Sequence, residues 1–527
     1  MIRVRQVKVL VNKDNLKEEI SKKLNINTKD IKDITIVKKS IDSRHKPNTY
    51  YVYEVDINVI NEEQILNKIN SCDIFKTPIE EYQFNPIGTN KLKNRIIIIG
   101  SGPSGLFTAY MLSSYGYKPL IIERGSDVDT RIDKVNRFWK ENILDTECNV
   151  QFGEGGAGTF SDGKLNTLIK DKNFRMKKVF EIFVENGAPQ DIMYENKPHI
   201  GTDILVSVVK NMRNKIIENG GEFRFNNKLT NIKYENNKLK SIIVNDNIEI
   251  NCDCLVLAIG HSARDTFKML YDNKLNMEPK PFAIGIRIQH SQELIDNNQY
   301  GKKFEKNLPP ASYKLTHTCK NKRGVYTFCM CPGGYVVNSS SEDKMLAING
   351  MSYHNRDSGV ANSAVIVTVT PKDFGNNPLD GIEYQRKLET ITYKAGNGLI
   401  PIQTFKDFVN NKETQKLGSI KPMFKGNYKL TNLNIIFPSY IIDSLKEGIY
   451  AFDKKIKGYA SDDAILAAIE SRTSSPVRII RDDNLESNIK GIYPTGEGAG
   501  YAGGITSSAM DGIKIAEEIM KKYRNGR

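Results

Sequence analysis

Three glycines, Gly100, Gly102 and Gly105, follow the pattern G-x-G-x-x-G, whose residue types and spacing suit a phosphate-bearing ligand. In this pattern the first glycine permits a tight turn, the second lets the backbone approach a pyrophosphate, and the third lets a helix pack closely on a strand. Glu123 lies 23 positions after Gly100, where an acid can accept hydrogen bonds from ribose hydroxyls. The spacing predicts a dinucleotide site, and the alternative is a tight turn in another kind of α/β protein.

Elements of the expected kinds surround this turn. Residues 95–99 form a short, apolar, β-branched run, which is typical of a strand buried on both faces. Residues 106–115 have helical character and stop at Gly116, and residues 119–122 form the next strand. A glycine fingerprint alone is a weak signal, but two strands, a helix and an acid supply the context that a dinucleotide-binding unit requires.

Two further stretches are rich in glycine. Residues 151–165 hold five glycines in eleven positions, which leaves few side chains to fill a core, so we expect this backbone to approach a ligand. The alternative is a mobile surface loop. Residues 492–505 place a strand end, Glu497 and several glycines before a helix over 506–523, which offers a second anion site at a helix N-terminus.

Three polar side chains are candidates for catalysis. His261 and Arg264 directly follow residues 254–260, a predicted buried strand that ends in glycine, and His199 precedes a helix cap. A histidine titrates near neutral pH and could relay a proton, while an arginine could stabilise negative charge. A structural, hydrogen-bonded role is an equally open alternative for each histidine.

Composition narrows the class of protein. The net charge of +14 would suit an acidic partner such as nucleic acid, but the lysines are dispersed and no dense basic run contains interleaved aromatic residues. Arg472 and Arg478 flank a polar turn and could bind an anionic substrate or a pyrophosphate, with surface ion pairing as the alternative. The N-terminus lacks the apolar core of a signal peptide, and no run approaches membrane-spanning length, so we expect a cytoplasmic protein with no membrane partner.

The seven cysteines do not indicate a disulfide framework. Cys329 and Cys331 would point to one face of a strand, and residues so spaced rarely close a good disulfide. Together with Cys252 and Cys254 they lack ordinary zinc spacing, so we predict no metal site. The absence of a C-x-x-C dithiol near the glycine motifs argues against a disulfide reductase.

The 527 residues should form two or three domains within an α/β protein. The pattern of residues 1–88 predicts a ferredoxin-like α+β unit of order β-α-β-β-α. Its basic loop 38–46 could bind an anion or could be a solvated hairpin loop. Residues 89–265 and 471–527 predict a discontinuous Rossmann-like domain. Residues 266–470 predict an inserted, β-rich substrate domain, with a helix over 462–472 at its end.

The glycine turn with Glu123, residues 258–260 and residues 495–504 form a spaced trio that resembles the flavoproteins of the glutathione-reductase-like FAD-binding fold. More narrowly, residues 153–165, 258–265, 328–334, 472–478 and 496–504 look like the uncharacterised NAD(FAD)-utilising dehydrogenases of bacteria. The resemblance covers nearly the whole chain and is specific for fold and FAD, but poor for substrate. Two features depart from it: Glu497 stands where many relatives have aspartate, and there is no second G-x-G-x-x-G.

The resemblance implies that the first motif holds the ADP half of FAD and the last contacts ribityl and flavin. It implies the following cofactor contacts: Gly100, Gly102, Pro103, Ser104, Gly105, Glu123, Arg124, Gly153, Gly155, Gly156, Ala157, Gly158, Thr159, Gly260, Gly496, Glu497, Gly503, Gly504 and Ile505. Because a separate nicotinamide domain is lacking, NAD(P)H would dock transiently as electron donor, or the electron source is something else.

Two functions follow as hypotheses. The first is an FAD-dependent oxidoreductase, a dehydrogenase that transfers electrons between FAD and an unidentified small molecule. The second is a flavoprotein that binds or modifies nucleic acid through its basic N-terminal unit. The sequence indicates neither the substrate nor the oligomeric state.

Overall fold

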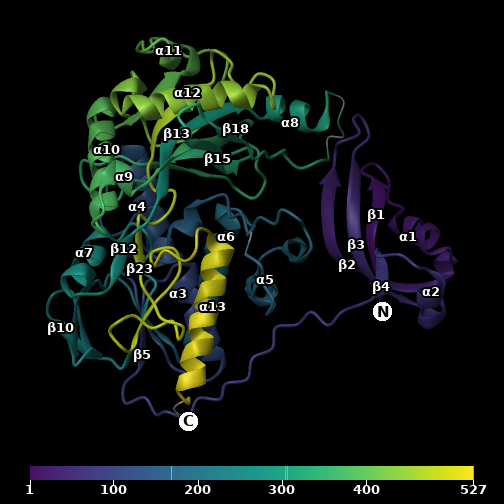
Figure 1. The fold of residues 1–527 in the computed structure, drawn as a ribbon, viewed down its shortest axis with the longest axis horizontal. Helices are drawn as coiled ribbons and strands as arrows, with labels where there is room; N and C mark the ends of the chain where they lie inside the picture. Colours follow the sequence, from purple (N-terminus) through teal and green to yellow (C-terminus); the bar gives the residue numbers. More distant parts are fainter. Residues whose placement is uncertain (168, 303, 305–306, 526–527) are drawn as a thin grey trace.

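The computed structural model describes all residues except 168, 303, 305–306 and 526–527, and it forms three bodies (Figure 1). The N-terminal unit, in purple, stands beside the others and is joined to them by a long linker. The parallel-sheet domain carries the yellow C-terminal helix, and the inserted domain, in green, lies above it. No helix in the described part of the chain is long and apolar enough to cross a membrane.

The N-terminal unit is a four-stranded sheet with two helices on one face. Its sheet has the order β2-β3-β1-β4, and its elements are β1 (Ile2–Leu10), α1 (Leu16–Leu24), β2 (Ile31–Asp42), β3 (Tyr50–Val59), α2 (Glu62–Lys68) and β4 (Ile74–Lys76). Alternating apolar residues of β1 and β3, such as Val4 and Val55, are fully buried against the helices. This is the predicted β-α-β-β-α order, extended by one short strand.

Contacts from the basic loop 38–46 help to fix the N-terminal unit to the rest of the molecule. The Lys39 ammonium pairs with Glu195 at 2.8 Å, and the Lys46 ammonium donates a hydrogen bond to the carbonyl of Asn298. Arg44 pairs with Asp42 of its own hairpin at 2.8 Å. The linker is held as well, because the amide of Gly88 donates to the carbonyl of Met520 in the C-terminal helix at 3.0 Å. The basic loop is therefore largely engaged by the chain itself.

The parallel-sheet domain is built from both ends of the remaining chain. Its sheet has the order β24-β11-β5-β6-β7 and is parallel throughout, with strands β5 (Ile96–Ile99), β6 (Leu120–Ile122), β7 (Glu222–Arg224), β11 (Cys254–Leu257) and β24 (Ile492–Pro494). All four residues of β5 and of β11 are buried, as their apolar sequences predict. The C-terminal strand pairs with β11, which makes the domain discontinuous.

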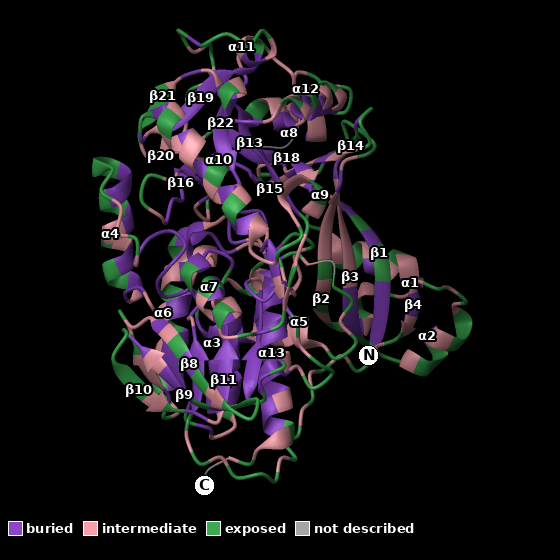
Figure 2. Cartoon of the chain, turned by 60° about the vertical axis from the view of Figure 1, so that its left-hand side comes forward, coloured by how far each residue is buried: buried purple, intermediate pink, exposed green. Residues whose placement is uncertain are grey.

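Helices pack against one face of this sheet, and a small meander with one helix packs against the other; two of the helices meet closely. The helices are α3 (Pro103–Ser114), α4 (Val128–Glu141), α5 (Arg175–Glu185), α6 (Thr202–Glu218), α7 (Arg264–Asp272) and α13 (Ile505–Lys522). A side chain at Gly512 of α13 would come within 2.2 Å of the carbonyl of Ser104 in α3, so glycine is required at this crossing. Figure 2 shows α13 buried along most of its length, whereas α4 exposes one side. A meander, β8 (Leu229–Glu235), β9 (Lys238–Val244) and β10 (Ile248–Asn251), follows α6.

The inserted domain is centred on a seven-stranded sheet of order β14-β15-β18-β13-β22-β19-β21. The strands are β13 (Phe282–Ser291), β14 (Thr316–Thr318), β15 (Gly324–Cys331), β18 (Val360–Val369), β19 (Ile400–Thr404), β21 (Tyr428–Leu430) and β22 (Ile465–Glu470). A small sheet of β16 (Tyr335–Asn338), β17 (Ile348–Met351) and β20 (Phe424–Lys425) lies alongside, and α8 (Gln292–Tyr300), α10 (Asp380–Gly396) and α12 (Ser439–Asp453) complete the domain.

The prediction of a helix over residues 462–472 is wrong. Residues Ile465–Glu470 form β22, a central strand paired with β13 on one side and β19 on the other. All six residues are buried, so the alanines and leucine that favour a helix in isolation fill the middle of a sheet instead.

Candidate functional site

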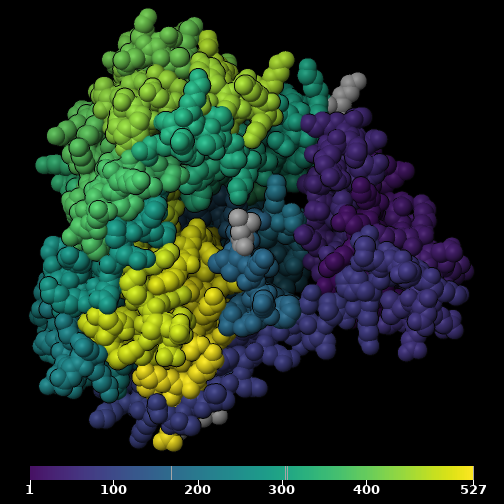
Figure 3. Space-filling model, viewed as in Figure 1, coloured from purple at the N-terminus to yellow at the C-terminus, as the bar shows by residue number. Residues whose placement is uncertain are grey.

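A cavity of about 230 Å³ lies where the parallel-sheet domain meets the inserted domain. Its walls come from the glycine turn, the ends of β6 and β11, the loop 151–164, the residues before α13, and strands of the inserted domain. In the space-filling view the green inserted domain sits over the yellow segment that leads into α13 (Figure 3). The predicted cofactor residues line this cavity except Gly105, Gly155 and Thr159, which pack behind it.

The three glycines of the turn meet different surroundings. A side chain at Gly100 would come within 2.3 Å of the carbonyl of Ala258, and one at Gly105 within 2.0 Å of the carbonyl of Gly100. Both glycines therefore serve the close packing of strand, turn and helix. Gly102 differs, since its nearest contact would be the Cα of Gly156 at 3.7 Å and its backbone is extended. Its missing side chain leaves open a strip of cavity beside the N-terminus of α3.

Glu123 is buried at the end of β6 and accepts four hydrogen bonds from the chain. Its Oε2 accepts from the amide and hydroxyl of Ser101 at 2.9 and 2.7 Å, and its Oε1 from the amides of Gly125 and Gly153 at 2.9 and 3.0 Å. The carboxylate therefore joins the glycine turn to the glycine-rich loop. Its predicted contact with ribose hydroxyls stays a prediction.

The glycine-rich loop is anchored by Arg131, a residue that sequence reasoning missed. The guanidinium of Arg131 is fully buried and donates hydrogen bonds to the carbonyls of Asn149, Val150, Gly153, Glu154 and Gly156. Burial lowers the pKa of Arg131 to about 10. These bonds fix the loop backbone against the glycine turn, which argues against a mobile surface loop.

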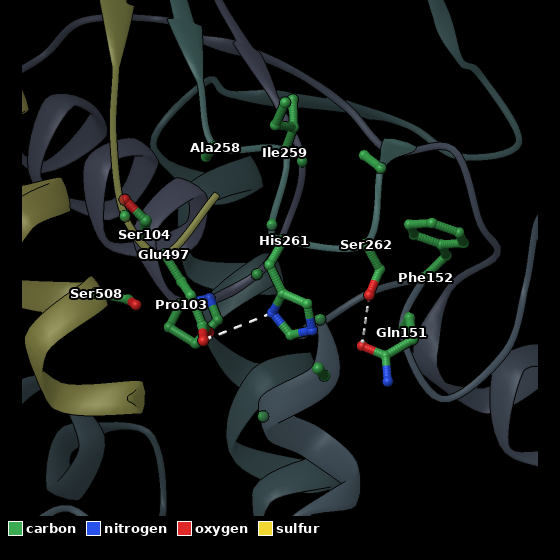
Figure 4. Close-up of a pocket in the computed structure, with 18 of the residues that line it drawn as sticks. Pro103, Ser104, Gln151, Phe152, Ala258, Ile259, His261, Ser262, Glu497 and Ser508 are labelled. Carbon is green, nitrogen blue, oxygen red and sulfur yellow. Dashed lines mark hydrogen bonds and ion pairs between the residues drawn. The ribbon is translucent and has the colours of Figure 1, made fainter. Parts of the chain in front are cut away.

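His261 and Glu497 face each other inside the cavity (Figure 4). The Nδ1 of His261 lies 3.5 Å from Oε1 of Glu497. The opposite ring nitrogen, Nε2, has no hydrogen-bond partner although the residue is only 8% exposed. A buried polar atom of this kind normally has a partner, so Nε2 is available to a molecule in the cavity.

Arg264, only three positions further on, does not line the cavity. Its guanidinium is buried and donates to Glu389 at 2.7 and 2.9 Å and to Gln385 at 3.0 Å, both on α10, and to Glu342 at 2.5 Å. Arg472 does line the cavity and shares Glu389 with Arg264. Arg264 thus joins α7 to the inserted domain, and its predicted catalytic role stays a prediction.

His199 also lies outside the cavity lining. Its two ring nitrogens face the carbonyls of Asp162 and His354 at 2.9 Å each, and its ring stacks on that of His354. Burial lowers the pKa of His199, with Arg356 acting in the same direction. The structure therefore places the three catalytic candidates at three separate positions, of which only that of His261 opens into the cavity.

One group of metal-ligating atoms is present in the described part of the chain. Atoms of His317, Cys319 and Glu447 lie within 4.8 Å of one another, between the edge strand β14 and α12. His317 Nε2 is already 3.1 Å from Glu447, and none of the three lines the cavity. The prediction of no metal site remains a prediction.

Comparisons with known proteins match three regions of the chain. Residues 281–473 match the family described as FAD-dependent protein, C-terminal domain-like, and residues 98–153 match the NAD(P)-binding Rossmann-like domain. Residues 1–58 match a domain of unknown function. A curated relative from Clostridium beijerinckii (strain ATCC 51743 / NCIMB 8052), itself described as an uncharacterized protein, is 49% identical over 530 residues and 99% of each chain.

Solved structures give a looser likeness. Glycine oxidase from Bacillus cereus ATCC 14579 is 12% identical, with a TM-score of 0.34 over 82% of this chain and 99% of that one. L-proline dehydrogenase from P. horikoshii is 12% identical, with a TM-score of 0.33 over 82% and 94% of the two chains. Likeness at these scores carries no argument about the substrate.

Proposed function

We propose that the cavity holds FAD and a small anionic substrate together. The chain belongs to the FAD-dependent oxidoreductases, in one family with its Clostridium beijerinckii relative. The enzyme is an oxidoreductase and its cofactor is FAD; the substrate and its charge are the proposal. The observation that carries it is that the lining of one cavity runs from the glycine turn to the strands of the inserted domain.

The residues of the cavity fit FAD. The open strip beside Gly102 admits a pyrophosphate where a side chain would block it, and Pro103 and Ser104 at the N-terminus of α3 line the same space. Gly503 and Gly504 precede α13 and leave open room at its N-terminus, which suits the flavin end. Glu123 and Glu497 would hold ribose and ribityl hydroxyls. Because the four acceptor sites of Glu123 are in use, a ribose hydroxyl would share one of them.

FAD supplies the electron chemistry, and the chain supplies position, charge and protons. His261 is the residue best placed to move a proton, because Glu497 lies beside its Nδ1 while its Nε2 is free to meet a ligand. The ion pairs of Arg264 favour a positioning role, since that guanidinium holds Glu389 and through it Arg472 at the cavity wall. The hydrogen bonds of His199 likewise favour the support of the loop that contains Asp162.

Excess positive charge at one side of the cavity supports an anionic substrate. Lys164 lines the cavity and lies 3.6 Å from Asp162, which is also paired with Arg356 at 2.6 Å. Lys197 is close to both cations: burial lowers its pKa, and Lys164 and Arg356 lower it further. Two cations thus pair with one carboxylate and a third cation lies near them, and this field would attract a carboxylate or phosphate ester into the cavity.

The experiment that tests the proposal is an anaerobic screen of flavin absorbance against carboxylates, phosphate esters and neutral metabolites, each with and without NAD(P)H. We expect bleaching by an anion, and we expect Lys164→Gln to raise the concentration needed for half-maximal bleaching by roughly tenfold, the effect of one charge contact. The matched control is Lys233→Gln, which removes an equal charge from a surface pair with Glu249. Bleaching by neutral molecules alone, or equal behaviour of the two variants, would contradict the anionic substrate.

A further inference from the structure

Strand β15 is irregular where it lines the cavity. Phe328 pairs with Ala364 of β18, but the next pair is Cys331 with Asn362, so β15 contains one residue more than its partner. This is a β-bulge, a device that redirects side chains next to active sites. Cys329 lies in the bulge with φ of 40°, a left-handed conformation that residues other than glycine rarely adopt.

The bulge gives two cysteines different exposure, although both line the cavity. Cys329 is exposed, whereas Cys331 is buried and directs its thiol to the carbonyl of Cys329 at 3.3 Å. Burial among protein atoms raises the pKa of the Cys329 thiol to about 12, so the group is a neutral thiol near neutral pH. A strained backbone that presents a thiol to a cavity is a feature expected of functional sites.

A buried arginine holds this wall in place. Arg287 on β13 is fully buried, and each of its five N–H groups donates a hydrogen bond. The acceptors are both oxygens of Glu470, at 2.8 and 3.4 Å, and the oxygens of Cys329 (main chain, 3.1 Å), Asn362 (2.7 Å) and Asn349 (3.1 Å). Cys329, Asn349 and Glu470 all line the cavity, so a single guanidinium fixes three lining residues from behind.

Two polar groups of the cavity can meet a ligand at this wall. His261 Nε2 is more than nine-tenths buried and unpaired, as described above, and its charge acts on Glu470 when the ring is protonated. The amide oxygen of Asn349 accepts from Arg287 and from Gly350, which turns its NH₂ group away from those donors. An amide N–H and an imidazole nitrogen together suit a carbonyl or carboxylate oxygen.

We propose that the Cys329 wall, defined as Cys329, Asn349 and Glu470 opposite His261, is the subsite for the reacting part of the substrate, a carbonyl or carboxylate group that Cys329 contacts. Arg287 is the positioning residue of this subsite. The inference rests on the proposed function, because it assigns the side of the same cavity that the inserted domain forms. It does not make Cys329 a nucleophile, since a neutral thiol packs against a ligand and donates a weak hydrogen bond.

Thiol labelling of the FAD-loaded protein tests this subsite. N-ethylmaleimide is applied at roughly pH 8.5, near the ordinary pKa of a thiol, and the modified peptides are mapped by mass spectrometry. We expect both exposed cysteines to be labelled in the folded protein, Cys72 rapidly and Cys329 slowly over a long exposure because its thiol is mostly neutral at this pH. Buried Cys148, Cys252, Cys254, Cys319 and Cys331 should be labelled only after unfolding. We also expect the visible absorbance of the flavin to shift as Cys329 is labelled in Cys72→Ser protein, and to stay constant in Cys329→Gly protein.

The glycine variant keeps the test sound, because glycine adopts the left-handed conformation of this position without strain and the protein should fold. Arg287→Lys tests the positioning role. A lysine ammonium cannot bond to all the acceptors that the guanidinium reaches, so the labelling rate of Cys329 should change by roughly tenfold while that of Cys72 stays the same. If the purified protein carries no FAD, the proposed function is wrong, whether or not Cys329 is labelled. A yellow protein in which Cys329 resists labelling, or is labelled with no change in the flavin spectrum, would defeat the subsite alone.

Discussion

Replacing Glu389 by glutamine should be among the most damaging single changes to the seam between the two domains. This carboxylate of α10 is fully buried and accepts two hydrogen bonds from Arg264, at 2.7 and 2.9 Å, and two from Arg472, at 2.8 and 3.0 Å. The hydroxyl of Ser471 donates a fifth at 2.7 Å. Glutamine keeps the size of the side chain but removes the charge that faces both guanidinium groups, although Arg264 keeps its second carboxylate partner, Glu342.

The expected loss follows from that geometry. Breaking a buried ion pair by removing one partner costs about 3–5 kcal/mol of unfolding free energy. The matched control is Glu383→Gln on the same helix, where the side chain is 65% exposed and pairs with Arg386 across one turn. Solvent screens that pair, so its loss should cost less than about 0.5 kcal/mol.

The stability difference between wild type and Glu389→Gln should depend on pH in a defined direction. Burial opposes ionisation of Glu389, but the guanidinium groups of Arg264 and Arg472 outweigh it and hold its pKa well below the ordinary 4.5. Because the pKa is lower in the folded state, the stabilisation is complete above pH 4.5 and is lost as pH falls below it. The gap in stability between wild type and Glu389→Gln should therefore narrow in acid.

Urea unfolding followed by the fluorescence of Trp139 and by flavin release would measure both effects. The two variants are compared with wild type at neutral pH and through the acid range. A difference between the variants below about 1 kcal/mol at neutral pH, or a gap that stays constant in acid, would refute the reasoning that this carboxylate is the charge partner of both arginines.

Three further predictions concern the cavity. Gly102→Val should fold, as judged by circular dichroism, but retain no FAD, as judged by absorbance. Gly105→Ala should fail to fold because its Cβ would lie 2.0 Å from a carbonyl. A yellow Gly102→Val protein would contradict the phosphate site. His261→Asn should keep FAD yet slow flavin reduction by about two powers of ten in stopped-flow measurements, and an unchanged rate per flavin would exclude proton relay. Cys329→Gly should raise the unfolding free energy by about 1 kcal/mol, because glycine adopts the left-handed conformation of this position without strain. The variant should also turn over more slowly. A variant that is less stable than wild type would argue against backbone strain at Cys329.

The glycine turn and its two strands were predictable because their determinants are local. A β-branched run, a glycine pattern and a helix start within thirty residues describe one unit whose parts touch each other. β22 was not predictable in the same way. Its sequence, Ile-Leu-Ala-Ala-Ile-Glu, has no β pattern of its own, and its conformation is imposed by β13 and β19, which come from segments far away along the chain.

The catalytic candidates show a second limit. His261 and Arg264 are neighbours in sequence, but one ends the loop after β11 and the other begins α7, so their side chains leave the chain in different directions. The two cysteines of β15 show the same limit, because a regular strand would expose both alike, whereas the bulge leaves Cys329 exposed and Cys331 buried. Side-chain direction depends on local irregularities that composition and spacing do not encode.

Buried arginines explain how irregular backbone can wall a cavity between two sheets. Loops and bulges leave carbonyl groups that no strand pairs, and each one buried without a partner would destabilise the fold. A guanidinium offers five donors in a rigid fork, which suits such scattered acceptors better than any other side chain. Arg131 satisfies the carbonyls of the glycine-rich loop, and Arg287 satisfies the bulge at Cys329 together with two amides and a carboxylate. Because neither arginine faces the cavity, each can be tested for a positioning role by whether its lysine variant changes the wall it holds and leaves the opposite wall intact.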